Sequence, residues 1–470
     1  MKHTPGIPST TLGLVGAALT TVSGVLILGL AAAAMQGFVG SPYVGIVAFL
    51  VLPGFFVLGL LLIPLGAWLA RRRARIAAER GEEIPHLPVV DLNDPLTRRR
   101  VLVVAVLTAV NVVVLGVAGY KGLQVMDSPA FCGSCHSVMD PEFTAYRRSP
   151  HARVSCVECH IGEGASWFVK SKLSGAWQLI SVTFDLYQRP IPTPIHNLRP
   201  ARETCEECHW PSKFTGDRLR VTTSYADDEA STEKKTVTLL HVGGGQTAAG
   251  PIQGIHAHVA PGVHIRYLSD PRRNVISTVE ATWADGKTVL YRTKDSPATL
   301  PPREGWREMD CVDCHNRPTH RFREPGPEID QAILARHVDG SLPWIKREGL
   351  AALQVAYPSH DAARAGIEKH LVDFYRQLDA AAWPSREPSV RAAAKALGDI
   401  YAWNVWPSMK ITWGTYPSFL GHDQAPGCFR CHDGDHVTAQ GKAISQDCGL
   451  CHSLLAVDEK NPKILSQLTP

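Results

Sequence analysis

The sequence has no cysteine outside six Cys-x-x-Cys-His pentads, so no thiol is left over for another purpose. It also has no charged side chain between His3 and Arg71, which is typical of segments that lie in lipid. Residues 101–470 carry no net charge, because Lys2 and a loop with eight arginines and five acids account for the whole +4 of the chain. Without a basic surplus, nothing supports nucleic-acid binding.

Each pentad has the spacing that attaches a c-type haem. Two thiols bond covalently to the porphyrin, and the following histidine binds the iron. Six repeats with no stray cysteine predict six covalently attached haems. The pentads contribute Cys132, Cys135 and His136, Cys156, Cys159 and His160, Cys205, Cys208 and His209, Cys311, Cys314 and His315, Cys428, Cys431 and His432, and Cys448, Cys451 and His452.

Zinc and disulfides are the alternatives for so many paired cysteines. Paired Cys-x-x-Cys motifs make tetrahedral zinc sites, and an even cysteine count is compatible with a disulfide framework. Neither explains why a histidine follows every pair, whereas haem attachment requires that histidine.

Three apolar runs in residues 1–120 predict a membrane anchor with transmembrane helices at about 11–35, 44–70 and 101–120, since a span needs about 20 residues. The Arg-rich loop 71–100 is predicted to be cytoplasmic, because basic loops stay inside. The pentads then lie on the far side of the bacterial inner membrane, facing the periplasm or the cell exterior. In the alternative interpretation, the first run is a cleaved signal, although it is longer than the usual signal core.

The pentad spacing divides the rest of the chain. First cysteines are 24, 49, 106, 117 and 20 residues apart, so the first two haems and the last two are expected to stack closely. We expect a haem domain at 121–215, a β-rich insert at 216–305 and a second haem domain at 306–470. Strands are predicted at 236–242, 263–268, 275–283 and 288–293, and helices over 327–401.

The expected fold is therefore a mainly α multihaem cytochrome c, with three N-terminal transmembrane helices, a small β-rich insert and little regular structure around the haems. Each iron needs a second axial ligand, which decides between electron transfer and catalysis at that iron. We favour histidines within a few residues of a pentad, and count two histidines of the insert and one methionine as further candidates. The favoured histidines are His151, His196, His320, His422 and His436, and the further candidates are His256, His258 and Met139.

Residues 101–215 resemble the quinol-oxidising cytochromes of the NapC/NirT family. The resemblance rests on an anchor leading into Phe131-Cys-Gly-Ser-Cys-His with Met139 nearby, on His151 ahead of Cys156, and on Lys170 and Lys172 after His160. It implies that electrons from membrane quinol enter near the bilayer and pass to periplasmic cytochromes or reductases. It further implies that Met139 ligates or neighbours the first haem, that His151 is a distal ligand, and that Lys172 contacts the quinol.

This chain departs from the family pattern in several ways. Its methionine lies one residue farther from the pentad histidine, and it has three expected spans instead of one, six pentads instead of four, and an inserted β segment. A quinol also releases protons, and the Asp140 carboxylate is a candidate acceptor. Two alternatives stay open: a terminal reductase of nitrite, hydroxylamine or a sulfur oxyanion with an open haem, and a passive electron-transfer subunit of a larger membrane complex.

Overall fold

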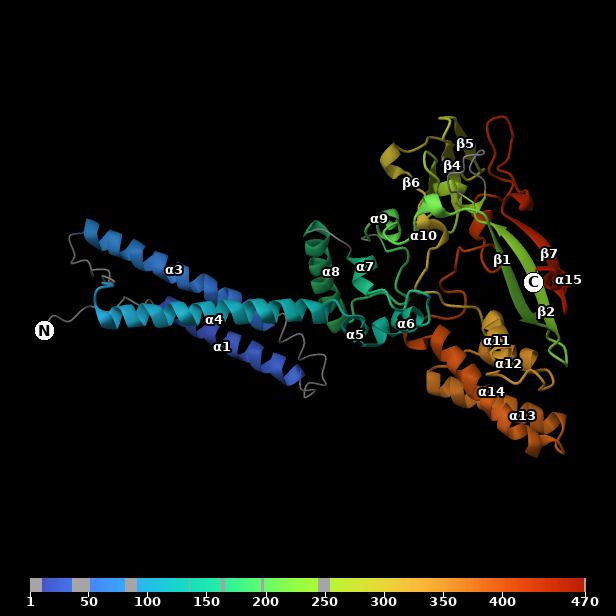
Figure 1. The fold of residues 1–470 in the computed structure, drawn as a ribbon, viewed down its shortest axis with the longest axis horizontal. Coiled ribbons are helices and arrows are strands. Elements are labelled where there is room, and N and C mark those ends of the chain that lie inside the picture. Colours follow the sequence, from blue (N-terminus) through green and yellow to red (C-terminus); the bar gives the residue numbers. More distant parts are fainter. Residues whose placement is uncertain are drawn as a thin grey trace. The chain divides into compact units, whose positions relative to one another are not determined.

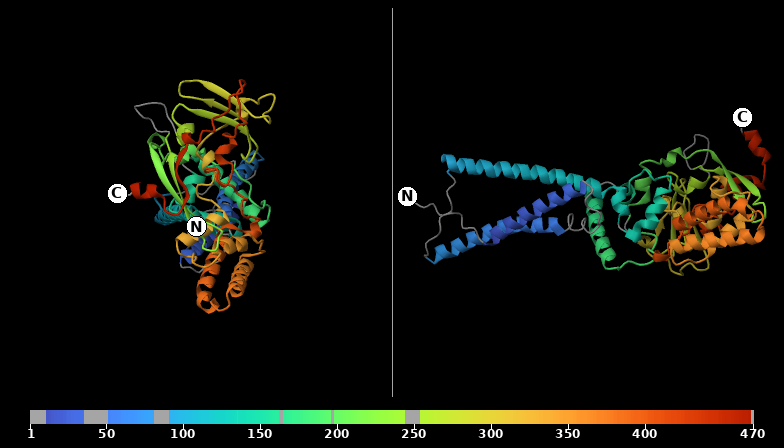
Figure 2. Two further views of the ribbon diagram at one scale, coloured as in Figure 1. Left: turned by 90° about the vertical axis from the view of Figure 1, so that its right-hand side faces the viewer. Right: turned by 90° about the horizontal axis from the view of Figure 1, so that it is seen from below.

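The computed structural model describes residues 11–35, 51–80, 91–134, 136–161, 165–195, 198–243 and 254–468 (Figure 1). The chain forms two compact units, residues 1–135 and 136–470. Figure 2 shows that helices dominate the first unit and that the second combines helices with strands. The described chain is about half helical with some strands, so the expectation of a mainly α fold holds only in part.

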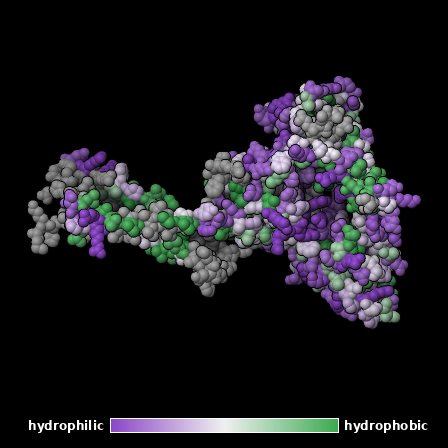
Figure 3. Space-filling view, in the orientation of Figure 1, coloured by the Kyte–Doolittle hydropathy of each residue, from purple (hydrophilic) through white to green (hydrophobic). Residues whose placement is uncertain are grey.

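The first unit consists of the helices α1 (Thr11–Met35), α3 (Leu52–Glu79), α4 (Pro95–Met126) and the short α5 (Pro129–Gly133). Helices α1 and α3 pack closely where Gly16 meets Gly59. A Cβ atom at Gly59 would lie 2.7 Å from the Gly16 carbonyl oxygen, so only glycine allows this approach. Small residues at a helix crossing are common in membranes. Figure 3 shows hydrophobic surface along these helices.

The three predicted spans have different outcomes. Among the described residues, one helical segment is long and apolar enough to cross a membrane, Leu52–Ala70, and a shorter apolar segment covers Val15–Gly29. The start of the predicted second span, residues 44–50, lies outside the described residues. Residues 101–120 are helical within α4. Three membrane crossings therefore stay a prediction.

The second unit begins with helices that carry or follow the early pentads and continues into a helical body. The early helices are α6 (His136–Arg147), α7 (Cys156–His160), α8 (Ala165–Thr183), α9 (Ala201–Cys205) and α10 (Cys311–Cys314). The helical body consists of α11 (Pro325–Leu334), α12 (Ile345–Gln354), α13 (His360–Leu378) and α14 (Trp383–Asn404), and α15 (Lys463–Leu468) follows near the end of the chain. The helices predicted over 327–401 are thus present.

Spacing along α13 explains how the helical body forms its core. Ile367 and Leu371 lie one turn apart and are fully buried, and Phe374 packs against the same cluster. Leu378, at the end of the helix, is exposed. This cluster joins all four helices of the body, and it lies apart from the pentads in the described structure.

Two antiparallel sheets occupy the region of the predicted insert. One has the order β5-β4-β3-β6, formed by β3 (His264–Ser269), β4 (Ile276–Thr282), β5 (Thr288–Arg292) and β6 (Arg307–Glu308). The other has the order β1-β2-β7, formed by β1 (Asp217–Tyr225), β2 (Glu233–His241) and β7 (His452–Glu459). The predicted hairpin turn contains Gly286 at φ 79°, a conformation that glycine adopts without strain.

Strand β7 was not expected, because it directly follows the last pentad, more than two hundred residues after its partner β2. Leu240 pairs with His452 and Leu239 with Ser453, so the sheet holds the sixth pentad beside the insert. The insert is therefore not a closed module: its first sheet is completed by the C-terminal segment.

Candidate functional site

Short helical turns present the pentads. Each described pentad starts at or inside such a turn. In the third, fourth and fifth pentads the histidine amide closes the turn by donating to the carbonyl oxygen of the first cysteine, four residues earlier. This distance is 2.8 Å for His209 and for His315, and 3.1 Å for His432. The turn gathers two thiols and an imidazole on one short segment. The turns at the second to sixth pentads are three to five residues long, but His136 begins the 12-residue helix α6 and His452 begins the eight-residue strand β7. The expectation of little regular structure around the haems therefore holds only in part.

Five of the six pentad histidines face a second histidine from elsewhere in the chain. The ring centroids lie 6.0 Å apart for His151 and His209, 6.1 Å for His160 and His320, 6.4 Å for His256 and His315, 5.9 Å for His258 and His432, and 6.0 Å for His422 and His452. The five values fall within half an ångström, although the partners come from unrelated segments.

This spacing fits an iron between each pair of rings. A metal ion binds an imidazole nitrogen at about 2 Å. The ring centre lies roughly 1 Å beyond that nitrogen, so two rings on opposite sides of one ion have centroids about 6 Å apart. Rings in direct stacking contact can come closer, as Phe214 and His256 do at 4.6 Å. The residues present therefore fit haem with two histidine ligands.

Hydrogen bonds fix the orientation of several of these rings. His256 Nδ1 lies 3.1 Å from the Val242 carbonyl oxygen, His258 Nδ1 lies 2.8 Å from that of Ile255, and His320 Nδ1 lies 3.0 Å from that of Glu142. A ring that donates from Nδ1 keeps the lone pair on Nε2, as metal-binding histidines require. Burial also lowers the pKa of His256 and His258, which favours the neutral form.

The pentads are neighbours in chain order. Helix α7 of the second pentad contacts α9 of the third. The thiols of Cys205 and Cys311, in the third and fourth pentads, are hydrogen-bonded, which lowers the pKa of Cys311 to about 7 and raises that of Cys205. Burial, and then the nearby charge of Cys428, raises the pKa of Cys451, so the fifth pentad adjoins the sixth. Pentads two to six thus form a row.

A buried ion cluster joins the fourth and fifth pentads. Asp313, which is 1% exposed, accepts hydrogen bonds from Tyr267 Oη at 2.6 Å, Arg307 Nε at 2.7 Å and Arg273 Nη1 at 3.3 Å. The Arg430 guanidinium from the fifth pentad donates to the backbone carbonyl oxygens of Asp313 and Arg273. Burial acts to lower the pKa of Arg307, but the Asp313 carboxylate holds that pKa above its usual value.

Two of the favoured distal candidates have other outcomes. His196 lies outside the described residues. His436 is fully buried, and its Nδ1 lies 3.0 Å from both carboxylate oxygens of Asp433, while its Nε2 has no hydrogen-bond partner in the described structure. The described ring contacts do not pair it with a pentad histidine, so its role as a distal ligand stays a prediction.

His256 and His258 are placed differently from our expectation. The sequence placed them two residues apart in the β-rich insert. They lie instead on a 3₁₀ turn, Ile255–Val259, where each residue advances the ring direction by about 120°. The two rings therefore point in different directions and meet the histidines of different pentads.

Met139 and Asp140 lie on α6, three and four residues after His136, and Lys172 lies on α8. All three are partly buried. The two helices pack against the same apolar cluster, through Val138 of α6 and Val182 of α8. Met139, Asp140 and Lys172 therefore belong to one part of the second unit.

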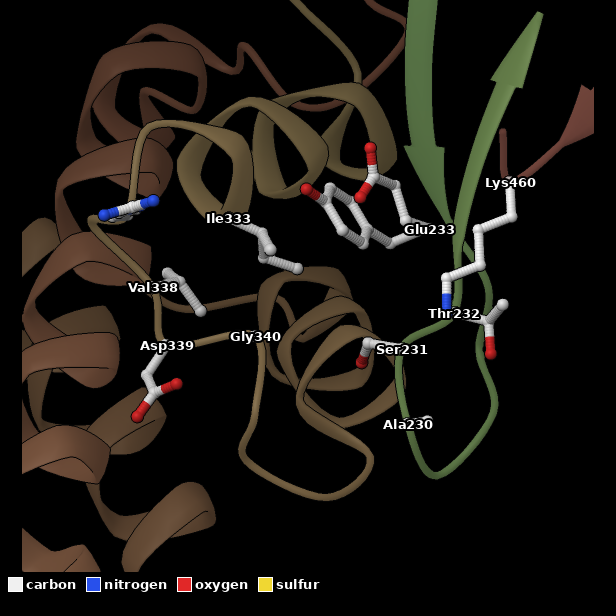
Figure 4. A pocket seen from close by; sticks show the side chains of 11 residues that line it. Ala230, Ser231, Thr232, Glu233, Ile333, Val338, Asp339, Gly340 and Lys460 are labelled. Atoms are coloured by element: carbon white, nitrogen blue, oxygen red, sulfur yellow. The ribbon is translucent and has the colours of Figure 1, made fainter. Parts of the chain in front are cut away.

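A shallow pocket of about 570 Å³ lies away from the pentads (Figure 4). The β1–β2 turn around Ser231 and Thr232 forms one side, and the segment after α11 with Val338 and Asp339 forms the other. It contains no pentad residue and no candidate ligand, so it is not part of the candidate site.

Comparison with known proteins gives a consistent result. The model of the NapC/NirT cytochrome c family, N-terminal region, matches residues 95–190. The chain is 40% identical over 466 residues to the cytochrome c-type protein ImcH of Geobacter sulfurreducens, covering 98% of this chain and 91% of that protein. It is 31% identical over 93 residues to the cytochrome c-type protein NrfH of Wolinella succinogenes, covering 19% of this chain and 52% of NrfH. No solved structure matches.

Proposed function

From the premise that this chain belongs to the NapC/NirT family of membrane-anchored multihaem c-type cytochromes, which transfer electrons, we propose that it oxidises membrane quinol and relays the electrons through six haems to periplasmic or outer carriers. The observation that carries the proposal is the row of histidine pairs, each at the spacing of one iron. When bound, a haem iron accepts or releases one electron.

We assign the axial ligands from these pairs. The second pentad takes His320, the third His151, the fourth His256, the fifth His258 and the sixth His422. Met139 stays our candidate for the first pentad. Two histidines hold an iron in the low-spin state without an open position, which suits electron transfer better than substrate binding. These pairs therefore count against a terminal reductase at five of the six sites.

Quinol chemistry is assigned to the membrane end of the row. Oxidation of a quinol to a quinone releases two protons and two electrons. We propose that the Asp140 carboxylate accepts a proton and that the Lys172 ammonium stabilises the oxygen anion that forms. Only nine residues lie between the end of α4, which contains the predicted third span, and the start of α6, so the chain ties this end of the row to the predicted anchor.

The number of haems can be tested directly. A pyridine haemochrome assay on the purified full-length protein is expected to give six covalently bound haems per chain, because all twelve cysteines belong to pentads. Replacing both Cys448 and Cys451 with alanine is expected to lower the count by one. A count that stays the same in this variant would contradict haem attachment at the sixth pentad.

The quinol step can be tested with Lys172→Ala in full-length protein reconstituted in lipid nanodiscs. We expect reduction of the haems by a menaquinol analogue to be roughly a hundredfold slower, because the developing oxygen anion loses its stabilising charge. Stopped-flow absorbance measures the rate. Lys170→Ala is the matched control on the same helix, where Lys170 lies over the Trp167 ring at 4.5 Å.

The alternatives predict other results in this experiment. Reduction by dithionite should be the same in all variants, because it bypasses the quinol site. Haem reduction that needs a second membrane subunit would favour the passive relay. A high-spin ferric signal with turnover of nitrite or hydroxylamine would favour the reductase.

A further inference from the structure

Helix α8 exposes an apolar stripe, formed by Leu173, Trp177, Ile180 and Phe184, to the outside of its unit. The four side chains are 69%, 60%, 45% and 69% exposed. Their spacing of four, three and four residues keeps them within an arc of about 60° on a helix that turns about 100° per residue. They therefore form one continuous face, with Phe184 directly after the last residue of the helix.

The opposite side of α8 faces the protein. Val182 lies about half a turn away from the stripe and packs against the cluster that contains Val138 and Tyr416, and Ser181 is buried. A helix on the surface of a soluble domain normally buries its apolar face and exposes its polar one. Helix α8 instead exposes an apolar face as well, so water is an unsuitable environment for its outer side.

Chain connectivity keeps this helix close to the membrane. Helix α4, which contains the predicted third span, ends at Met126, and α6 begins at His136. Ten residues extend over at most about 35 Å. Val138 of α6 belongs to the same apolar cluster as Val182 of α8. Helix α8 is therefore packed on the part of the second unit that the chain ties most closely to the anchor.

The residue types match a lipid surface. Tryptophan, phenylalanine and leucine are the side chains that interfacial helices place at the boundary between headgroups and acyl chains, with basic residues above them. Lys170 and Lys172 lie just before the stripe, where they can face lipid phosphates. We propose that α8 lies in the outer leaflet of the membrane with its stripe among the acyl chains, as a second attachment of the haem domain beside the transmembrane anchor.

The contact can be tested by placing a photo-reactive benzoylphenylalanine at Leu173, Trp177 or Phe184 in the full-length haem-loaded protein in phosphatidylethanolamine–phosphatidylglycerol nanodiscs. We expect mass spectrometry to find at least tenfold more phospholipid adduct at these positions than at Val275. Val275 is a matched control because it is apolar and 60% exposed, and it directly precedes strand β4. Haem absorbance shows that each variant is folded.

Two results would overturn the proposal. Lipid adducts no more frequent at Trp177 than at Val275 would show that the stripe is not in the bilayer. Adducts formed with a second copy of the chain or with another protein would show that a protein covers the stripe instead. The measurement needs no quinol, so failure of quinol oxidation would leave its outcome unaffected.

Discussion

Replacement of His320 by alanine is expected to remove the second histidine ligand from the second haem site and to convert that site to the high-spin state. His160 and His320 face each other at 6.1 Å, so one ring would remain where two are needed. Electron paramagnetic resonance should show a ferric high-spin signal from about one-sixth of the haem, because the other pairs are unchanged. Reduction of the haems beyond this site by quinol should slow strongly.

Two further variants make this experiment specific. His337→Ala removes an exposed histidine that contacts no pentad histidine in the described structure, and it should leave the spectra unchanged. His320→Met keeps two ligands and should stay low-spin, but with a higher reduction potential, because a thioether ligand raises the potential relative to imidazole. A low-spin spectrum in His320→Ala would contradict the assignment of this ligand.

The histidine pairs show why the sequence could identify candidate distal ligands but could not assign each of them to a particular pentad. Closeness to a pentad selected His151, His320 and His422, and each of them does face a pentad histidine. None faces the pentad that it is closest to in the sequence: His151 precedes the second pentad and faces His209, and His320 follows the fourth and faces His160. A ligand on a short tether lies beside its own pentad, where it reaches the site of another pentad more easily than its own.

This cross-pairing has a consequence for the assembly. His151, His320 and His422 each join a segment next to one pentad with the site of another, so these ligands hold different sites together. His422 illustrates the point, because its ring stacks on Phe429 of the fifth pentad at 4.4 Å and faces His452 of the sixth at 6.0 Å.

Other features depend on contacts between distant parts of the chain, and sequence could not reveal them. Local alternation predicted most of the central strands, since it reports which residues face inwards. It did not predict β7, whose pairing with β2 depends on the fold of the residues between them. His436 was favoured for its closeness to the fifth pentad. Its ring is buried and its Nδ1 lies 3.0 Å from an Asp433 carboxylate oxygen, and its role as a distal ligand stays a prediction.

Substitution of Asp313 by alanine is expected to cost about 3–5 kcal/mol of stability, because it leaves buried charges without their partner. The change removes the acceptor for Arg307, Arg273 and Tyr267 at once. It also removes a side chain that caps the backbone nitrogen of Asp310 at 2.8 Å, where the fourth pentad begins. Denaturant titration of the full-length protein in detergent, followed by circular dichroism, measures the loss.

Graded substitutions separate the charge from the hydrogen bonds in this cluster. Tyr267→Phe removes one neutral donor and should cost only about 1 kcal/mol, since the two arginines still neutralise the carboxylate. Asp295→Ala, an exposed acid on the loop after β5, should change stability by less than about 0.5 kcal/mol. Equal losses in Asp313→Ala and Tyr267→Phe would mean that the hydroxyl bond, and not the ion pairs, holds the fourth pentad beside the fifth. The contrast matters for electron transfer. Arg430 of the fifth pentad donates to the backbone carbonyl oxygen of Asp313 in the fourth, so a shift of Asp313 would move the two pentads apart.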